Sequence, residues 1–238
     1  MIRLAAALLA VVAVPALAVA PAAKPRTSAT RNWADVAAFT ADGGVRLGNP
    51  NAPVKLVEYG SMTCPHCQAF EQEGAPTLVG KYVKGGRVSW EFRNYVRDSF
   101  DIAASLIARC NGAGRFFPLT RALFVDQRAW LGRGMAAPQA RIEAAANLPT
   151  DRQFLEIARI AGLQQWAAAR GVPMAKSAQC LTNAGGVEQL VRTTGIASDR
   201  YPDFPGTPTF ILNGVMLDRT ASWDALEPQL RRALGERR

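Results

Sequence analysis

The chain has 238 residues, 49% of them hydrophobic, with 20 glycines and 15 prolines. This composition indicates one or two globular domains with a buried core, and it excludes a disordered chain or a scaffold held together only by disulfides. The formal net charge is +9, but its one dense basic cluster is the last eight residues, and no nucleic-acid-binding motif accompanies it. We therefore expect a solvated basic surface and no nucleic-acid partner.

The first 18 residues have the pattern of a cleavable signal peptide. A short positive start at Arg3 is followed by an apolar run to about residue 20, and Ala16-Leu17-Ala18 is a small-x-small cleavage pattern. An uncleaved membrane anchor is the alternative, but the run is alanine-rich and short for a bilayer span of ~20 residues. We expect cleavage after Ala18 and an exported protein, in which stable disulfides are permitted.

The next part of the chain predicts a leader followed by a strand–helix–strand unit. Residues 19–44 are expected to form an N-terminal leader, with a short helix over 33–39. Residues 54–59 are β-branched and almost continuously apolar, as in a buried strand, and residues 87–95 alternate as a second strand. A helix is expected between them, up to about residue 82. The order strand, helix, strand predicts a parallel βαβ unit.

The middle of the chain is rich in alanine, leucine and arginine at helical spacing. Ile102, Leu106 and Cys110 lie four residues apart, on one face of a helix. After this block, Asn213-Gly214 predicts a hairpin turn between two short strands. The expected domain organisation is a frame of residues 45–97 and 186–238, interrupted by an all-helical insertion, residues 98–185. The expected later elements are helices at 115–125, 138–146, 151–170, 175–182, 187–194 and 222–234, and strands at 209–213 and 215–217.

Two cysteines, Cys64 and Cys67, flank the single histidine of the chain, His66. A structural zinc site needs four ligands, whereas the other two cysteines, Cys110 and Cys180, each stand alone in the sequence. A zinc site and a pair of inert buried thiols are therefore the weaker alternatives. A Cys-x-x-Cys that opens a helix directly after a strand has the placement that redox chemistry requires.

The start of a helix favours a thiolate because its unpaired backbone N–H groups and positive dipole end stabilise the anion. We expect Cys64 to be an exposed nucleophile of low pKa and Cys67, one turn later, to be a shielded resolving cysteine. His66 would add a positive charge or an N–H donor near the Cys64 sulfur. Pro65 would stiffen the loop, and Thr63 would cap the helix.

These motifs resemble the thioredoxin fold: a strand, Cys64-Pro65-His66-Cys67, a helix, and a late Thr207-Pro208 before another strand. The Pro-His dipeptide and the long helical insertion resemble the DsbA-type thiol:disulfide oxidoreductases of that superfamily, over about residues 45–238. The resemblance implies an α/β thioredoxin fold with an inserted all-helical domain.

The resemblance also assigns roles to individual residues. Cys64 would be the nucleophile and Cys67 the resolving cysteine, and Thr207-Pro208 would be a loop whose cis peptide bond lies against the disulfide and faces the substrate chain. An ordinary proline at the entry of a strand is the alternative for Pro208. Glu58 matches the position of a buried acid beneath the resolving cysteine, and a solvent-accessible carboxylate at the strand edge is its alternative.

The activity that the resemblance implies is transfer of the Cys64–Cys67 disulfide to reduced, newly exported proteins by a monomeric periplasmic enzyme without cofactor or metal. A membrane protein of the DsbB type would reoxidise it. The Pro-His loop favours an oxidase, whereas Thr207 is also common in isomerases. A DsbC-type isomerase carries a separate N-terminal dimerisation domain, for which residues 19–44 are too few. An isomerase or reductase and a non-enzymatic thioredoxin-like chaperone stay as alternatives.

The remaining cysteines, Cys110 and Cys180, both fall in the helical insertion. An even number of cysteines in an exported protein favours a second, structural disulfide, which would join the first and last helices of that block. Two buried free thiols are the alternative.

Overall fold

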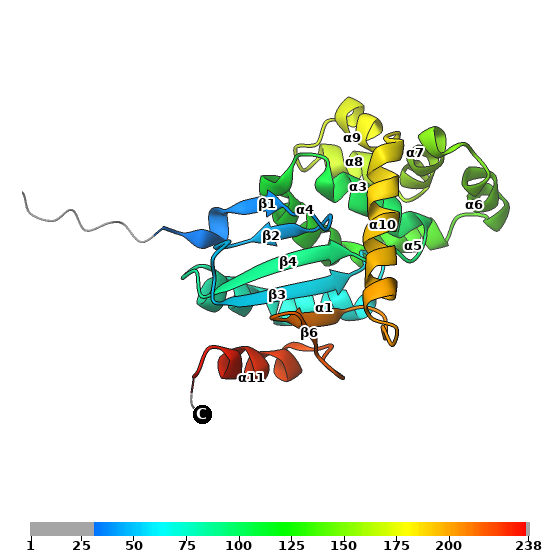
Figure 1. The fold of residues 1–238 in the computed structure, drawn as a ribbon. Helices are drawn as coiled ribbons and strands as arrows, with labels where there is room; N and C mark the ends of the chain where they lie inside the picture. Colours follow the sequence, from blue (N-terminus) through cyan, green and yellow to red (C-terminus); the bar gives the residue numbers. More distant parts are fainter. Residues whose placement is uncertain (1–30, 237–238) are drawn as a thin grey trace, which may run out of the picture. The chain divides into compact units, whose positions relative to one another are not determined.

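The computed structural model describes residues 31–236, so the expected signal peptide, residues 1–18, lies outside the described residues. The fold is built on a mixed six-stranded sheet with the strand order β1-β2-β4-β3-β5-β6 (Figure 1). The strands are β1 (Ala37–Phe39), β2 (Val45–Leu47), β3 (Val54–Gly60), β4 (Val88–Asn94), β5 (Thr209–Leu212) and β6 (Val215–Met216).

The central pair of strands is the predicted βαβ unit. β3 and β4 are parallel, with Leu56 opposite Trp90 and Glu58 opposite Phe92, which confirms the prediction. All other neighbouring strands are antiparallel. Gly60, the last residue of β3, lies so close to the Phe92 ring that a Cβ atom there would come within 2.6 Å of it. Glycine at this position therefore lets the chain leave the sheet towards the cysteines.

The predicted hairpin is also confirmed. β5 and β6 pair antiparallel across Asn213-Gly214, whose φ angles of 50° and 87° are both in the left-handed region. Two consecutive positive φ values are the requirement of the tight turn that Asn-Gly favours.

Helices cover both faces of the sheet. On one face α10 (Ala184–Arg200) runs across the strands, and its Ala197 packs with Tyr59 and Ile211 (Figure 1). On the other face the core contains residues of α1, α4 and α11, among them Phe70. The other helices are α1 (Pro65–Glu73), α2 (Ala75–Thr77), the π-helix η2 (Leu78–Val83), α3 (Ser99–Arg109), α4 (Ala113–Val125), α5 (Gln127–Met135), α6 (Gln139–Ala146), α7 (Thr150–Ile160), α8 (Leu163–Ala168), α9 (Met174–Leu181) and α11 (Trp223–Ala233).

The expectation of a leader over residues 19–44 is wrong for its last part. Instead of a helix over 33–39, a single 3-10 turn, η1 (Trp33–Asp35), precedes β1, which pairs with β2 at the sheet edge. An alanine-rich stretch favours a helix locally, but three backbone pairings to β2 override that preference. Residues 37–44 therefore belong to the sheet and its first turn.

Two helix predictions also differ from the structure, and one helix was not predicted. The helix expected over 151–170 is divided into α7 and α8, because Gly162 adopts a φ of 71° that ends the first helix. The helix expected over 187–194 extends over Ala184–Arg200. α5 was not predicted, since its glycines at 132 and 134 weaken the helical signal. No helix within residues 31–236 is long and apolar enough to cross a bilayer.

Candidate active site

The two cysteines of the Cys-x-x-Cys motif lie where β3 ends and α1 begins. Cys64 is itself the N-cap of α1, and Pro65 is the first helical residue. Thr63, expected to cap the helix, does not do so: its hydroxyl donates instead to Asp98 Oδ2 at 2.7 Å. The positive end of α1 is therefore presented to the Cys64 side chain.

The Cys64 sulfur lies against the loop that precedes β5. Its thiol donates to the Thr207 carbonyl oxygen at 3.1 Å, and the Thr207–Pro208 peptide bond is cis. The expectation of an exposed Cys64 is wrong, because this loop covers the residue and leaves it only 1% exposed. Cys67 is completely buried, and both thiols are reduced.

The surroundings of the two thiols lower the pKa of Cys64 and raise that of Cys67. A hydrogen bond from the Cys67 side chain lowers the pKa of Cys64 to about 5, against the opposing effect of burial, and the backbone N–H groups of Cys67 and His66 lower it further. Burial raises the pKa of Cys67 well above its ordinary value, and the charge of Glu58 acts in the same direction. At neutral pH, Cys64 is thus the thiolate and Cys67 the thiol.

His66 contributes a backbone N–H group to the surroundings of Cys64. The side chains of both His66 and Pro65 are exposed, and among the hydrogen bonds that lower the pKa of Cys64 the contribution of His66 is its backbone N–H. Stabilisation of the thiolate by the His66 imidazole stays a prediction, while the backbone of the first turn of α1 contributes directly.

Glu58 lies in the interior, 1% exposed, and accepts a hydrogen bond from Trp90 Nε1 at 3.1 Å. Burial raises its pKa well above the ordinary value, and the nearby Glu71 raises it further. Glu71 is also buried, accepts a hydrogen bond from Arg121 at 2.9 Å, and has its pKa raised to about 7 by burial. Glu71 was missed in the sequence, although it lies four residues after Cys67 and so on the same face of α1.

We expect replacement of Glu58 by glutamine to slow resolution by Cys67. Glutamine can still accept the Trp90 hydrogen bond, but it cannot take the proton that Cys67 must lose in order to attack. General base catalysis contributes about 100-fold or more. The rate at which Cys67 releases glutathione from a Cys64–glutathione mixed disulfide, followed by quenched alkylation and mass spectrometry, should fall by at least about tenfold and lose its pH dependence.

The matched control is Glu143→Gln, which removes an exposed carboxylate on α6. It should leave the rate unchanged. Equal rates for Glu58→Gln and the wild type at every pH would remove Glu58 from the mechanism.

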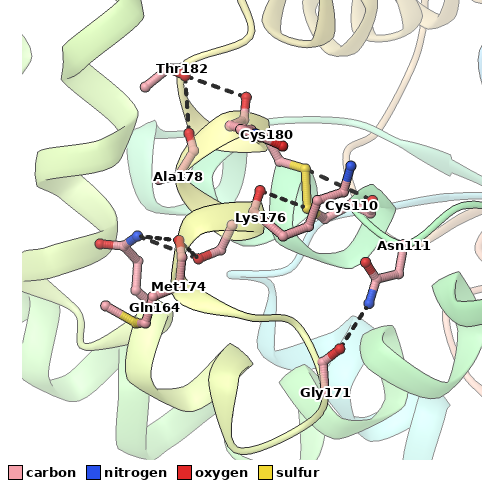
Figure 2. The surroundings of a disulfide bond; sticks show 11 residues. Cys110, Asn111, Gln164, Gly171, Met174, Lys176, Ala178, Cys180 and Thr182 are labelled. Carbon is pink, nitrogen blue, oxygen red and sulfur yellow. Dashed lines mark hydrogen bonds between the residues drawn. A yellow bond between two sulfur atoms is a disulfide. The ribbon is translucent and has the colours of Figure 1, made fainter.

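Away from the dithiol, Cys110 and Cys180 form a disulfide between the end of α3 and α9 (Figure 2). The two Cα atoms are 5.7 Å apart, and the residues are separated by 70 positions in the sequence. Both cysteines are partly exposed. The bond therefore closes a large loop that contains α4 to α8.

A thioredoxin fold with a dithiol at the start of α1, beside a cis-proline loop, defines the class of thiol–disulfide exchange proteins. The thioredoxin family model matches residues 40–232. The solved protein-disulfide isomerase of Novosphingobium aromaticivorans is 34% identical, with a TM-score of 0.76, over 80% of this chain and 97% of that one. The chain therefore belongs to the thioredoxin family, and the solved structures that share its fold include DsbA-type proteins.

Two further relatives extend the comparison. A Rickettsia felis protein named a protein-disulfide oxidoreductase is 30% identical over 82% of this chain, and the match spans 64% of that protein. The chain thus spans less than two thirds of the length of the curated relatives it matches. Wolbachia pipientis alpha-DsbA1 is 19% identical, with a TM-score of 0.66 over 83% of this chain and 94% of that one, and shares the fold.

Proposed function

We propose that this chain is an exported oxidase that transfers the Cys64–Cys67 disulfide to reduced proteins. A substrate thiolate attacks Cys64 of the oxidised pair, the Cys64–Cys67 bond breaks, and Cys67 leaves and takes up a proton. A second substrate thiolate then attacks the substrate sulfur of the mixed disulfide and releases Cys64 as a thiolate. The substrate loses two electrons, and the protein ends as the dithiol.

The observation that carries this proposal is the position of Cys64 at the N-terminus of α1, beside the cis Thr207–Pro208 bond, and the low pKa of Cys64 agrees with it. A thiol with a pKa of about 5, in place of the ordinary ~8.5, is almost fully ionised at pH 7. Ionisation then stabilises the reduced protein by about 2.7 kcal/mol more than it does for an ordinary thiol, which corresponds to a reduction potential higher by about 60 mV. A stabilised leaving thiolate makes the disulfide a better donor.

The test of the oxidase is equilibration of the protein in glutathione buffers, combined with oxidation of a reduced two-cysteine peptide. We expect a potential more positive than about −200 mV and stoichiometric oxidation of the peptide. A reduction potential near the −270 mV typical of thioredoxin would contradict the oxidase. Failure to oxidise the peptide would favour a non-enzymatic chaperone instead.

An isomerase is the second candidate, and the likeness to the Novosphingobium aromaticivorans isomerase supports it. The two activities separate in one comparison. An oxidase acts in its disulfide form on a reduced protein, whereas an isomerase acts in its dithiol form on a protein with scrambled disulfides. The isomerase would be favoured if the scrambled substrate regained its native disulfides faster with the dithiol form of this chain than with its disulfide form.

Export to the periplasm, the monomeric state and a membrane reoxidant of the DsbB type complete the proposal. The signal pattern in residues 1–18 supports export. N-terminal sequencing of the protein from a periplasmic fraction should begin at Val19, and gel filtration should give a mass near that of one chain. Reoxidation of the Cys64–Cys67 dithiol should require added membranes that contain the reoxidant.

A further inference from the structure

The four residues before α1, residues 61–64, are here called the pre-cysteine segment, and all of them are buried. Met62, in the middle, is held on both sides of its backbone. Its N–H donates to Asp101 Oδ1 at 2.9 Å, and its carbonyl oxygen accepts from Gln127 Nε2 at 2.8 Å. Asp101 belongs to α3 and Gln127 to α5. Side chains from two helices, α3 and α5, thus form hydrogen bonds with the backbone of Met62, beside the dithiol.

Asp101 is a fully buried carboxylate held only by hydrogen-bond donors. Besides Met62 N, it accepts from Ser61 Oγ at 2.5 Å, from Arg97 N at 3.1 Å and from Ser105 Oγ at 3.3 Å. No lysine or arginine within residues 31–236 forms an ion pair with it. Burial raises the pKa of Asp101 to about 7, and the hydrogen bonds from Ser61 and from the Met62 and Arg97 N–H groups act in the opposite direction. These donors therefore hold the Asp101 side chain in place.

Gln127 is 4% exposed and uses one nitrogen atom for two bonds. Nε2 donates to the carbonyl oxygen of Met62 and, at 3.0 Å, to that of Cys64. The Cys64 carbonyl also accepts from Gln68 N at 3.1 Å, which is the first backbone hydrogen bond of α1. Gln127 therefore fixes the backbone of the nucleophile at the point where α1 begins.

We propose that Asp101 and Gln127 are positioning residues that clamp the pre-cysteine segment and thereby set the reactivity of Cys64. The inference rests on the proposed function, because it assigns Cys64 as the reactive thiol. The sulfur is stabilised by the backbone N–H groups of His66 and Cys67 in α1, and this requires the Cys64 backbone to stay at the N-cap position. Loosening the segment moves the sulfur relative to these donors.

The test measures the ionisation of Cys64 in the full chain, from thiolate absorbance at 240 nm against pH. Gln127→Met keeps the length of the side chain but removes the donors to both carbonyls. Asp101→Asn keeps the shape but loses acceptors for Ser61 and the backbone. Each is expected to raise the pKa of Cys64 by about one pH unit, the size of one hydrogen bond to a charged sulfur, and to slow alkylation at pH 6 several-fold.

Gln164→Met is the matched control. Gln164 is 3% exposed and donates only inside the helical region, to Met174 O at 3.5 Å and Ser177 Oγ at 3.4 Å. Its variant should lose thermal stability without changing the pKa of Cys64. The proposal is overturned if both active-site variants titrate like the wild type, or if Gln164→Met shifts the pKa equally. Thiol ionisation needs no substrate, so the result stands whether or not the wild type oxidises peptides.

Discussion

Replacement of Cys64 by serine is expected to abolish disulfide exchange. Replacement of Cys67 by serine is expected to stop the reaction at the mixed disulfide on Cys64. Without Cys64 the protein has no nucleophile, because Cys67 is fully buried and its pKa is raised. Without Cys67, the Cys64 thiolate still attacks a disulfide, but no resolving thiol releases the product. Mass spectrometry after incubation with oxidised glutathione should show a stable one-glutathione adduct for Cys67→Ser and none for Cys64→Ser.

The reduced wild-type protein gives the pH dependence of the reaction. Because the thiolate is the reactive form, the alkylation rate of Cys64 in the reduced protein should rise with pH and reach half its maximum near pH 5. Iodoacetamide at pH 6, counted by intact mass, should label Cys64 once and leave Cys67 unmodified. An alkylation midpoint near pH 8.5, or equal labelling of the two cysteines, contradicts the assignment.

The elements nearest the dithiol could be predicted because their signals are local. β3 is β-branched and almost continuously apolar, and Asn213-Gly214 is a turn pair with a specific backbone requirement. The strand–helix–strand order leaves a parallel pair as the simplest arrangement. β1 could not be predicted in this way. Its three residues are stabilised by pairing with β2, and a strand of that length has no periodicity of its own.

The same contrast holds within the site. The spacing of Cys64 and Cys67 is visible in the sequence, and so is the proline at 208. Gln127 lies 60 residues after Cys67, and nothing in its neighbourhood marks it as a partner of the Cys64 backbone. The burial of Cys64 could not be predicted, because the loop at Thr207 covers this residue only after the chain has folded. Local chemistry identifies the reacting atoms, whereas their surroundings are set by contacts between distant segments.

The second large effect concerns stability. Replacement of both Cys110 and Cys180 by alanine is expected to lower the free energy of unfolding by about 4 kcal/mol, because the disulfide spans 70 residues and restricts the unfolded chain. For a protein of this size, that loss corresponds to a melting temperature lower by about 10 °C. Denaturant unfolding of the wild type and of the double variant, without reductant, measures the difference.

Cys64→Ser/Cys67→Ser is the matched control, compared with the wild type in a glutathione buffer that opens the Cys64–Cys67 pair and leaves the Cys110–Cys180 disulfide closed. It also removes two cysteines, but both are free thiols in the structure, so no loop closure is lost. The control isolates the crosslink from the packing of the thiols. Because Cys110 and Cys180 are partly exposed, their replacement by alanine removes little buried surface, and the loss should therefore come from the unfolded state. Equal stability of the Cys110/Cys180 variant and the oxidised wild type would show that this disulfide contributes nothing to the fold.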